Sequence, residues 1–400
     1  MSGRAFNPVF RGLLFLAGLF FLNFTTRVIF SPLLPRLEGE FHLDHAAAGS
    51  FFLLISTGYF FSILTSGFVS TRINHKKTIV LSTFAAGTIL LVLSFCTTLF
   101  WLRFGLLSLG LAAGLYLPSG LASVVRLVPS AYLARGMAVH ELAPNFGFIV
   151  APILADMMLR YCSWQQGLRW LGFLMISIGV LYNLTGSGCQ ERGRSLDRLT
   201  SQAILSLSEF WLMVLLFSLA ICSSLGVYAM LPLFLTSDQG MSPERASRLL
   251  AISRLAALVM PLVGGWLGDR LGNRVVMGGS LMMAGLCTAL LGLTESSFWL
   301  IIFVILQPMF AVCFFPSGFA ALSAMSGLTL DSGLKERGGT IAVSLCMPVA
   351  FLLGGGVAPV VIGSIGDHAS IGIGFMVTGA AVIAGAMLSF FVSCEKYGKK

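Results

Sequence analysis

Charged side chains are scarce in this chain of 400 residues. Only 10% of the residues are Asp, Glu, Lys or Arg, whereas 56% are hydrophobic. A water-soluble fold needs a largely polar surface, and this composition does not supply one. The mean hydropathy of +0.91 therefore favours a protein that lipid covers over much of its surface.

Three further patterns are missing, and each argues against a class of chemistry. No G-x-x-x-x-G-K-[ST] loop is present, so we do not expect ATP-driven transport by this chain. The eight cysteines form no C-x-x-C pair and no histidine stands at ligand spacing, so we expect neither a metal nor a cofactor. Because the five histidines are dispersed, no nucleophile and base converge, and we expect no catalytic residues and no enzyme activity.

Long apolar runs fill most of the chain. Each is long enough to span a bilayer as a helix, and continuous runs of this length are not barrel strands. They lie at about 11–35, 46–70, 78–97, 99–122, 136–159, 168–186, 209–235, 246–267, 275–294, 297–325, 338–364 and 370–393. The sequence thus predicts an all-α membrane protein with twelve transmembrane helices.

The basic residues indicate how the helices are oriented. The formal net charge is +9, but these residues stand between apolar runs and so do not suggest a nucleic-acid partner. With the N-terminus inside, cytoplasmic segments carry 17 Lys or Arg residues and outer segments carry 6. The positive-inside rule therefore predicts a multi-pass inner-membrane protein with both termini in the cytoplasm.

Internal repetition divides the chain into two halves. Phe100-Trp101-Leu102 recurs as Phe298-Trp299-Leu300, an offset of 198 residues (298 − 100), and other short matches keep the same offset. We expect a six-helix half over 1–186, a cytoplasmic linker over 187–208 and a second, pseudo-symmetric six-helix half over 209–400. Parallel repeats with the substrate between them are a common transporter architecture, and we expect a monomer.

Two loops carry a family signature. The segment Gly265-Trp-Leu-Gly268-Asp269-Arg270-Leu-Gly272-Asn273-Arg274 resembles the G-x-x-x-D-R-x-G-R-[RK] motif of the major facilitator superfamily. Its counterpart at 67–77 keeps Gly67 and Arg72 but has Thr71 at the acidic position. The resemblance implies twelve helices, secondary transport and loops that gate the cytoplasmic face. Arg72, Asp269, Arg270 and Arg274 are the gating candidates.

Two arginines stand well inside predicted spans, away from the span ends. Burial of a charge at membrane depth costs about 2.5–3.5 kcal/mol on insertion scales, so such residues are candidates for function. Arg27 follows Arg11 by 16 residues (27 − 11), and Arg254 precedes Asp269 by 15 residues (269 − 254). A guanidinium matches carboxylate or phosphate through paired donors, which favours an anionic substrate. The alternatives are snorkelling or carbonyl capping by Arg27 and a structural pairing of Arg254.

Other polar groups in the spans complete the predicted site. Asn23 would add hydrogen bonds beside Arg27, and the remaining candidate ligands are Tyr116, Asn145, Tyr228 and Gln307. Each of these four has the alternative of a hydrogen bond to a neighbouring helix. His140 and Glu141 are candidates for carrying the proton in symport, although Glu141 has the alternative of an ion pair with Arg126 or Arg135.

These features predict a secondary active transporter. Its substrate would be a small organic anion, such as a carboxylate, sugar acid or phosphorylated metabolite, moved by alternating access with a proton as coupling ion. The alternatives are an exporter of amphipathic or drug-like compounds and a non-transporting sensor built on the same fold. Two membrane arginines disfavour a cationic substrate, because like charges repel strongly at low dielectric.

Overall fold

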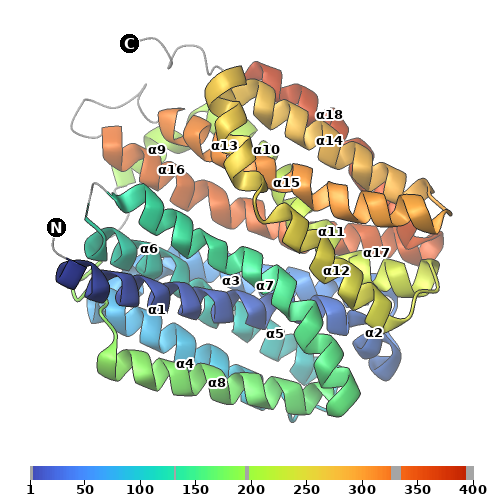
Figure 1. Ribbon diagram of the computed structural model, residues 1–400, viewed down its shortest axis with the longest axis horizontal. Coiled ribbons are helices and arrows are strands. Elements are labelled where there is room, and N and C mark those ends of the chain that lie inside the picture. Colours follow the sequence, from blue (N-terminus) through green and yellow to red (C-terminus); the bar gives the residue numbers. More distant parts are fainter. Residues whose placement is uncertain (1–2, 130–131, 194–197, 326–334, 393–400) are drawn as a thin grey trace. The chain divides into compact units, whose positions relative to one another are not determined.

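A computed structural model describes residues 3–129, 132–193, 198–325 and 335–392, and these residues are helical almost throughout (Figure 1). The first eight helices are α1 (Gly3–Val28), α2 (Phe30–Phe41), α3 (His45–Ile73), α4 (His75–Leu93), α5 (Leu99–Gly114), α6 (Tyr116–Leu127), α7 (Leu133–Tyr161) and α8 (Trp164–Thr185). The next five are α9 (Arg198–Leu205), α10 (Ser208–Ile221), α11 (Val227–Leu233), α12 (Pro243–Ala257) and α13 (Met260–Leu271). The last five are α14 (Asn273–Leu293), α15 (Ser297–Met325), α16 (Lys335–Ala350), α17 (Ala358–His368) and α18 (Ile371–Leu388). No strand occurs among the described residues.

The described helices form 12 spans that are long and apolar enough to cross a membrane, which confirms the predicted fold class. Several spans consist of two helices with an irregular turn between them. The seventh span, for example, runs from Ser208 to Asp238 and contains the π-helical turns Cys222–Gly226 and Phe234–Asp238. A third π-helical turn, Phe351–Val357, precedes α17.

Proline explains two of these interruptions. Pro32 has no N–H for the carbonyl of Val28, four residues earlier, and α1 ends at Val28. Pro118 has the same effect on the carbonyl of Gly114, where α5 ends. The fourth span is therefore broken into α5 and α6, whereas α15 runs through Pro316 without a break.

The chain forms two compact units that do not follow the sequence halves exactly. The first contains residues 1–33 and 54–195, and the second contains 34–53 and 196–400. Residues 34–53, which contain the last part of α2 and the first part of α3, thus belong to the second unit although they come early in the chain. The division into 1–186, 187–208 and 209–400 stays a prediction.

A glycine-mediated helix contact of the same kind occurs in each of the two units. In the first unit α4 packs against α8, and a Cβ on Gly87 would lie 2.9 Å from the carbonyl oxygen of Gly172. In the second unit α14 packs against α18, side by side in Figure 1, and a Cβ on Gly379 would lie 2.5 Å from the carbonyl oxygen of Gly285. Gly285 follows Gly87 by the repeat offset of 198 residues (285 − 87). Small residues let membrane helices approach closely enough for backbone contact.

Replacing Gly379 with Ala is expected to destabilise the protein. The added methyl group would meet backbone atoms of Gly285 and Ala289, which cannot rotate away, and overpacking of this kind costs about 1–3 kcal/mol. Gly279→Ala is a matched control, because a Cβ there has nothing within 4 Å. Thermal unfolding in detergent should show a lower transition temperature for Gly379→Ala alone. Equal transition temperatures would contradict the close contact.

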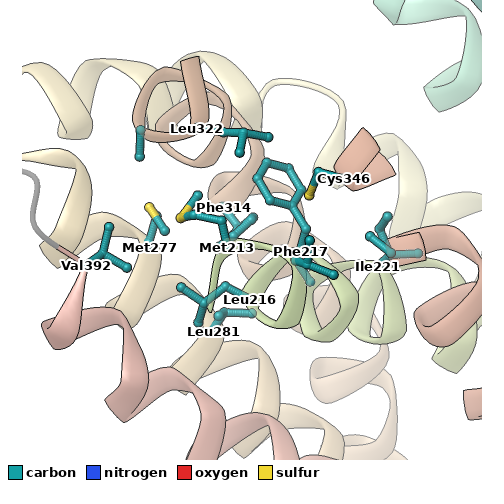
Figure 2. Close-up of a cluster of buried hydrophobic side chains, with 14 of the residues drawn as sticks. Met213, Leu216, Phe217, Ile221, Met277, Leu281, Phe314, Leu322, Cys346 and Val392 are labelled. Carbon is teal, nitrogen blue, oxygen red and sulfur yellow. The ribbon is translucent and has the colours of Figure 1, made fainter. Parts of the chain in front are cut away.

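The second unit has a continuous apolar core (Figure 2). Phe217 on α10 packs edge-to-face on Phe314 of α15, with ring centroids 5.2 Å apart, and Cys346 of α16 belongs to the same cluster. Met277 and Leu281 extend the cluster along α14. These buried side chains hold α10 in place, and the π-helical turn of the candidate site continues directly from α10.

Candidate functional site

Arg27 occupies the last turn of α1, next to the break that Pro32 causes. Its side chain is only 6% exposed, and its guanidinium carbon lies 4.1 Å from the ring centroid of Tyr59 on α3 and 5.1 Å from that of Phe24. No carboxylate among the described residues forms an ion pair with it, and its buried Nε has no hydrogen bond there. A desolvated cation–π contact contributes about 2 kcal/mol, which offsets much of the cost of burying the charge.

Asn23 stands one helical turn before Arg27, but most of its hydrogen bonds stay within the protein. Its Nδ2 donates to the carbonyl of Ala113 at 3.2 Å and to Ser82 Oγ at 3.5 Å. Its buried Oδ1 accepts no hydrogen bond from the described residues. Asn23 therefore ties α1 to α4 and α5, and its remaining group is an acceptor, which does not bind an anion.

Arg254 lies on α12 and is 5% exposed. Its guanidinium carbon stands 4.7 Å from the ring centroid of Tyr228 on α11, and its Nη2 donates a short hydrogen bond to the backbone carbonyl of Ser224. Nη1 lies 3.5 Å from Ser224 Oγ. The structure thus shows a structural pairing of Arg254, the alternative given for it, with a backbone carbonyl as partner and an aromatic contact beside it.

The carbonyl of Ser224 is available because of the π-helical turn Cys222–Gly226. Such a turn replaces the regular i to i−4 bonds and so leaves acceptors for other donors. Gln307 uses the same turn, since its Nε2 donates to the carbonyl of Ser223 at 2.8 Å and to Thr288 Oγ1 at 3.2 Å. Gln307 therefore binds a neighbouring helix, the alternative that the sequence left open.

Both repeats contain an arginine–tyrosine contact, but the two residues occur in opposite order along the chain. In the first unit the arginine comes from the first span and the tyrosine from the second, and in the second unit the order is reversed. Tyr228 follows Arg27 by 201 residues (228 − 27), and Arg254 follows Tyr59 by 195 (254 − 59), both close to the repeat offset of 198. The sequence analysis did not identify Tyr59. Its spacing from Arg254, close to the repeat offset, is the signal that could have identified it.

His140 is fully buried on α7 in a parallel stack of three rings. The ring centroid of His140 lies 4.6 Å from that of Phe20 on α1 and 6.0 Å from that of Tyr116 on α6. Both rings are nearly parallel to the imidazole. Tyr116 Oη is 3.2 Å from His140 Nε2 and donates to the carbonyl of Leu16 at 2.6 Å. The hydroxyl of Tyr116 thus contacts groups on neighbouring helices, which is the alternative given for this residue.

Glu141, the next residue, is 53% exposed. Its Oε1 lies 3.5 Å from His140 Nδ1, and Tyr59 and Tyr116 both have this carboxylate as a charged neighbour. Asn145 donates to the backbone carbonyl of Glu141 at 3.2 Å. Arg126, one of the alternative partners of Glu141, instead forms an ion pair with Glu191 at 3.1 Å. Glu141 therefore lies beside His140 and near Tyr59, the residue on which Arg27 stacks.

The predicted gating residues lie at helix ends. Arg72 stacks on Phe68 at 4.6 Å and Arg270 on Trp266 at 4.3 Å, each on its own helix. Arg274 donates to the carbonyl of Val392. Asp269 is exposed. A gating role for these residues stays a prediction.

The fold and the motifs agree with one known family. The model of the Major Facilitator Superfamily matches residues 16–247 and 212–399. The chain belongs to the major facilitator superfamily. Solved structures show the same fold: a bacterial homologue of the human lysosomal transporter Spinster superposes with a TM-score of 0.78 at 14% identity over 95% of this chain and 96% of that one. The nucleoside transporter NupG superposes with a TM-score of 0.75 at 16% identity over 97% and 100%.

Three relatives that match in sequence are named for a transported compound or for a sensor role. A probable sulfoacetate transporter, SauU of Cupriavidus necator, is 23% identical over 94% of this chain and 91% of its own. The cis,cis-muconate transport protein of Acinetobacter baylyi is 23% identical over 92% and 91%. The membrane sensor protein UhpC of Salmonella typhimurium is 24% identical over 74% and 72%. The chain is therefore a multi-pass membrane protein of a transporter family and not an enzyme.

Proposed function

We propose that this protein is a secondary transporter of small organic anions in the inner membrane, with both termini in the cytoplasm. It works by alternating access, and a proton gradient drives it. The observation that supports an anion most directly is Arg27, a buried guanidinium that stacks on Tyr59 and forms no ion pair with a described carboxylate. Its positive charge is thus stabilised but not neutralised.

The surroundings of Arg27 favour an anion over a cation for a physical reason. A cation near this group would meet a like charge at low dielectric, whereas a carboxylate, sulfonate or phosphate would accept two parallel hydrogen bonds. Arg254 provides a second guanidinium of the same kind in the other unit. Two relatives are named for organic anions, sulfoacetate and cis,cis-muconate, which agrees with this substrate class.

Counterflow in proteoliposomes tests transport itself. Purified protein is reconstituted, loaded with unlabelled sulfoacetate or cis,cis-muconate, and diluted into the labelled compound, with a cationic dye in a parallel series. We expect labelled anion to accumulate transiently and the dye not to. The sensor function, favoured by the relatives named UhpC, would give anion binding without counterflow. Counterflow of the dye alone would support the exporter instead.

Replacing Tyr59 with Leu is expected to raise the KM for the transported anion. The ring holds the guanidinium in place, and its loss removes a contact that contributes up to about 2 kcal/mol, so we expect an increase of about tenfold or more. Tyr59→Phe keeps the ring and should lose much less. Initial uptake rates over a range of anion concentrations provide the comparison, and an equal KM in both variants would contradict the role of the ring.

A further inference from the structure

The hydroxyl of Tyr116 has one proton and two neighbours. It donates that proton to the carbonyl of Leu16 at 2.6 Å, since a carbonyl oxygen can only accept. His140 Nε2 lies 3.2 Å from the same hydroxyl oxygen. The hydrogen between these two atoms must therefore come from the imidazole, which makes Nε2 the donor.

This constraint fixes the other ring nitrogen as well. A neutral imidazole has one N–H, so Nδ1 carries a lone pair when Nε2 carries the hydrogen. Nδ1 is buried, has no hydrogen bond among the described residues, and lies 3.5 Å from Glu141 Oε1. Stacking on Phe20, with ring centroids 4.6 Å apart, opposes a flip of the ring, which would put carbon atoms in place of Nδ1 and Nε2.

We infer that Tyr116 is a positioning residue that holds His140 in the Nε2–H tautomer, and that the coupling proton binds at Nδ1, where Glu141 Oε1 shares it. This inference rests on the proposed proton-driven transport. Proton uptake converts a neutral imidazole and a carboxylate into an imidazolium–carboxylate pair, so the net charge of the pair changes from −1 to 0. Half-exposed Glu141 is the group through which the proton enters.

The same change reaches the anion-binding group. The titratable groups near this pair are Tyr116 of α6, whose hydroxyl contacts His140, and Tyr59 of α3, which has Glu141 as a charged neighbour. Tyr59 carries Arg27 on its ring. Protonation removes the net negative charge of the His140–Glu141 pair. The Arg27 guanidinium then attracts an anion more strongly, because that negative charge no longer opposes it. Proton binding thus favours anion binding, which is what symport requires.

Nitrogen NMR of the full-length protein labelled at histidine tests the tautomer without reference to transport. His140→Gln assigns the signal. We expect an Nε2–H tautomer at alkaline pH in the wild type, protonation at Nδ1 on acidification, and a mixture of tautomers in Tyr116→Phe. Tyr182→Phe is a matched control, because the Tyr182 hydroxyl is buried in the same unit without a hydrogen bond among the described residues. An Nδ1–H tautomer in the wild type would overturn the inference.

Uptake of cis,cis-muconate or sulfoacetate, whichever exchanges in counterflow, separates positioning from a structural role. Tyr116→Phe should lower gradient-driven uptake about tenfold, roughly the contribution of one buried hydrogen bond, and change its pH profile, while exchange at equal pH is retained. An equal loss of uptake and exchange, or no loss of either, would overturn the inference. If the wild type exchanges neither compound nor any other anion, the proposed function fails, and the NMR result still decides where the proton binds.

Discussion

Arg27→Gln is expected to lower anion uptake about 100-fold, since truncating one partner of a buried, hydrogen-bonded charge pair costs 2–5 kcal/mol or more. The substitution keeps a polar side chain of similar length but removes the charge and the paired donors that a carboxylate or phosphate needs. Arg27→Lys keeps the charge without the planar fork, and we expect an intermediate rate. The measurement is the initial rate of labelled anion uptake into proteoliposomes at several concentrations.

Arg169→Gln is the matched control for this prediction. Arg169 also lies over an aromatic ring of the first unit, 4.5 Å from Phe95, and donates to Ser94 Oγ at 3.3 Å. Its loss removes the same charge and the same kind of contact, but away from the candidate site, so uptake should be unchanged. If both substitutions lower uptake equally, the effect of Arg27 is one of net charge or folding, and the proposed role is wrong.

Glu141→Gln is expected to abolish anion accumulation against a gradient while exchange at equal pH persists. Glutamine carries no charge, so it imitates the protonated state of the His140–Glu141 pair at every pH. The anion should therefore bind well without a proton, and its apparent affinity at neutral pH should be higher than in the wild type. The steady-state ratio of internal to external anion under an imposed pH gradient measures the first effect, and the concentration dependence of exchange measures the second.

Asp156→Asn controls for the loss of an acidic residue from α7. Asp156 pairs with Arg160 on the same helix at 2.9 Å and follows His140 by 16 residues (156 − 140), more than four helical turns. Accumulation by this variant should match the wild type. If Glu141→Gln still accumulates the anion under a pH gradient, the coupling proton is carried elsewhere, although the substrate class is unaffected.

Most of the fold could be predicted from the sequence, because apolar length and charge placement are local properties. The twelve spans follow from runs with almost no charge. The repeat offset of 198 residues also relates Gly87 to Gly285, and each of these two glycines lies at a close contact between helices. The irregular turns could not be placed in the same way. A π-helical turn such as Cys222–Gly226 depends on which donors reach its carbonyls, and these come from Arg254 and Gln307 on other helices.

The candidate site was predicted in part. Arg27 and Arg254 stand out in any reading of the sequence, since a charge in an apolar run is rare. Tyr59 does not stand out, because a tyrosine in such a run usually packs or hydrogen-bonds locally. Tyr116 was identified as a polar group of the site, but the sequence could not show that its hydroxyl is divided between Leu16 and His140.

Ligand binding to the purified protein tests the central claim most directly. Thermal unfolding is followed with a panel of carboxylates, sulfonates and phosphate esters, each paired with its uncharged amide or alcohol and compared on wild type and Arg27→Gln. We expect at least one anion to raise the transition temperature of the wild type, its uncharged partner to have no effect, and the shift to disappear in Arg27→Gln. Stabilisation by the uncharged partners or by cationic compounds, with no anion active, would contradict the account.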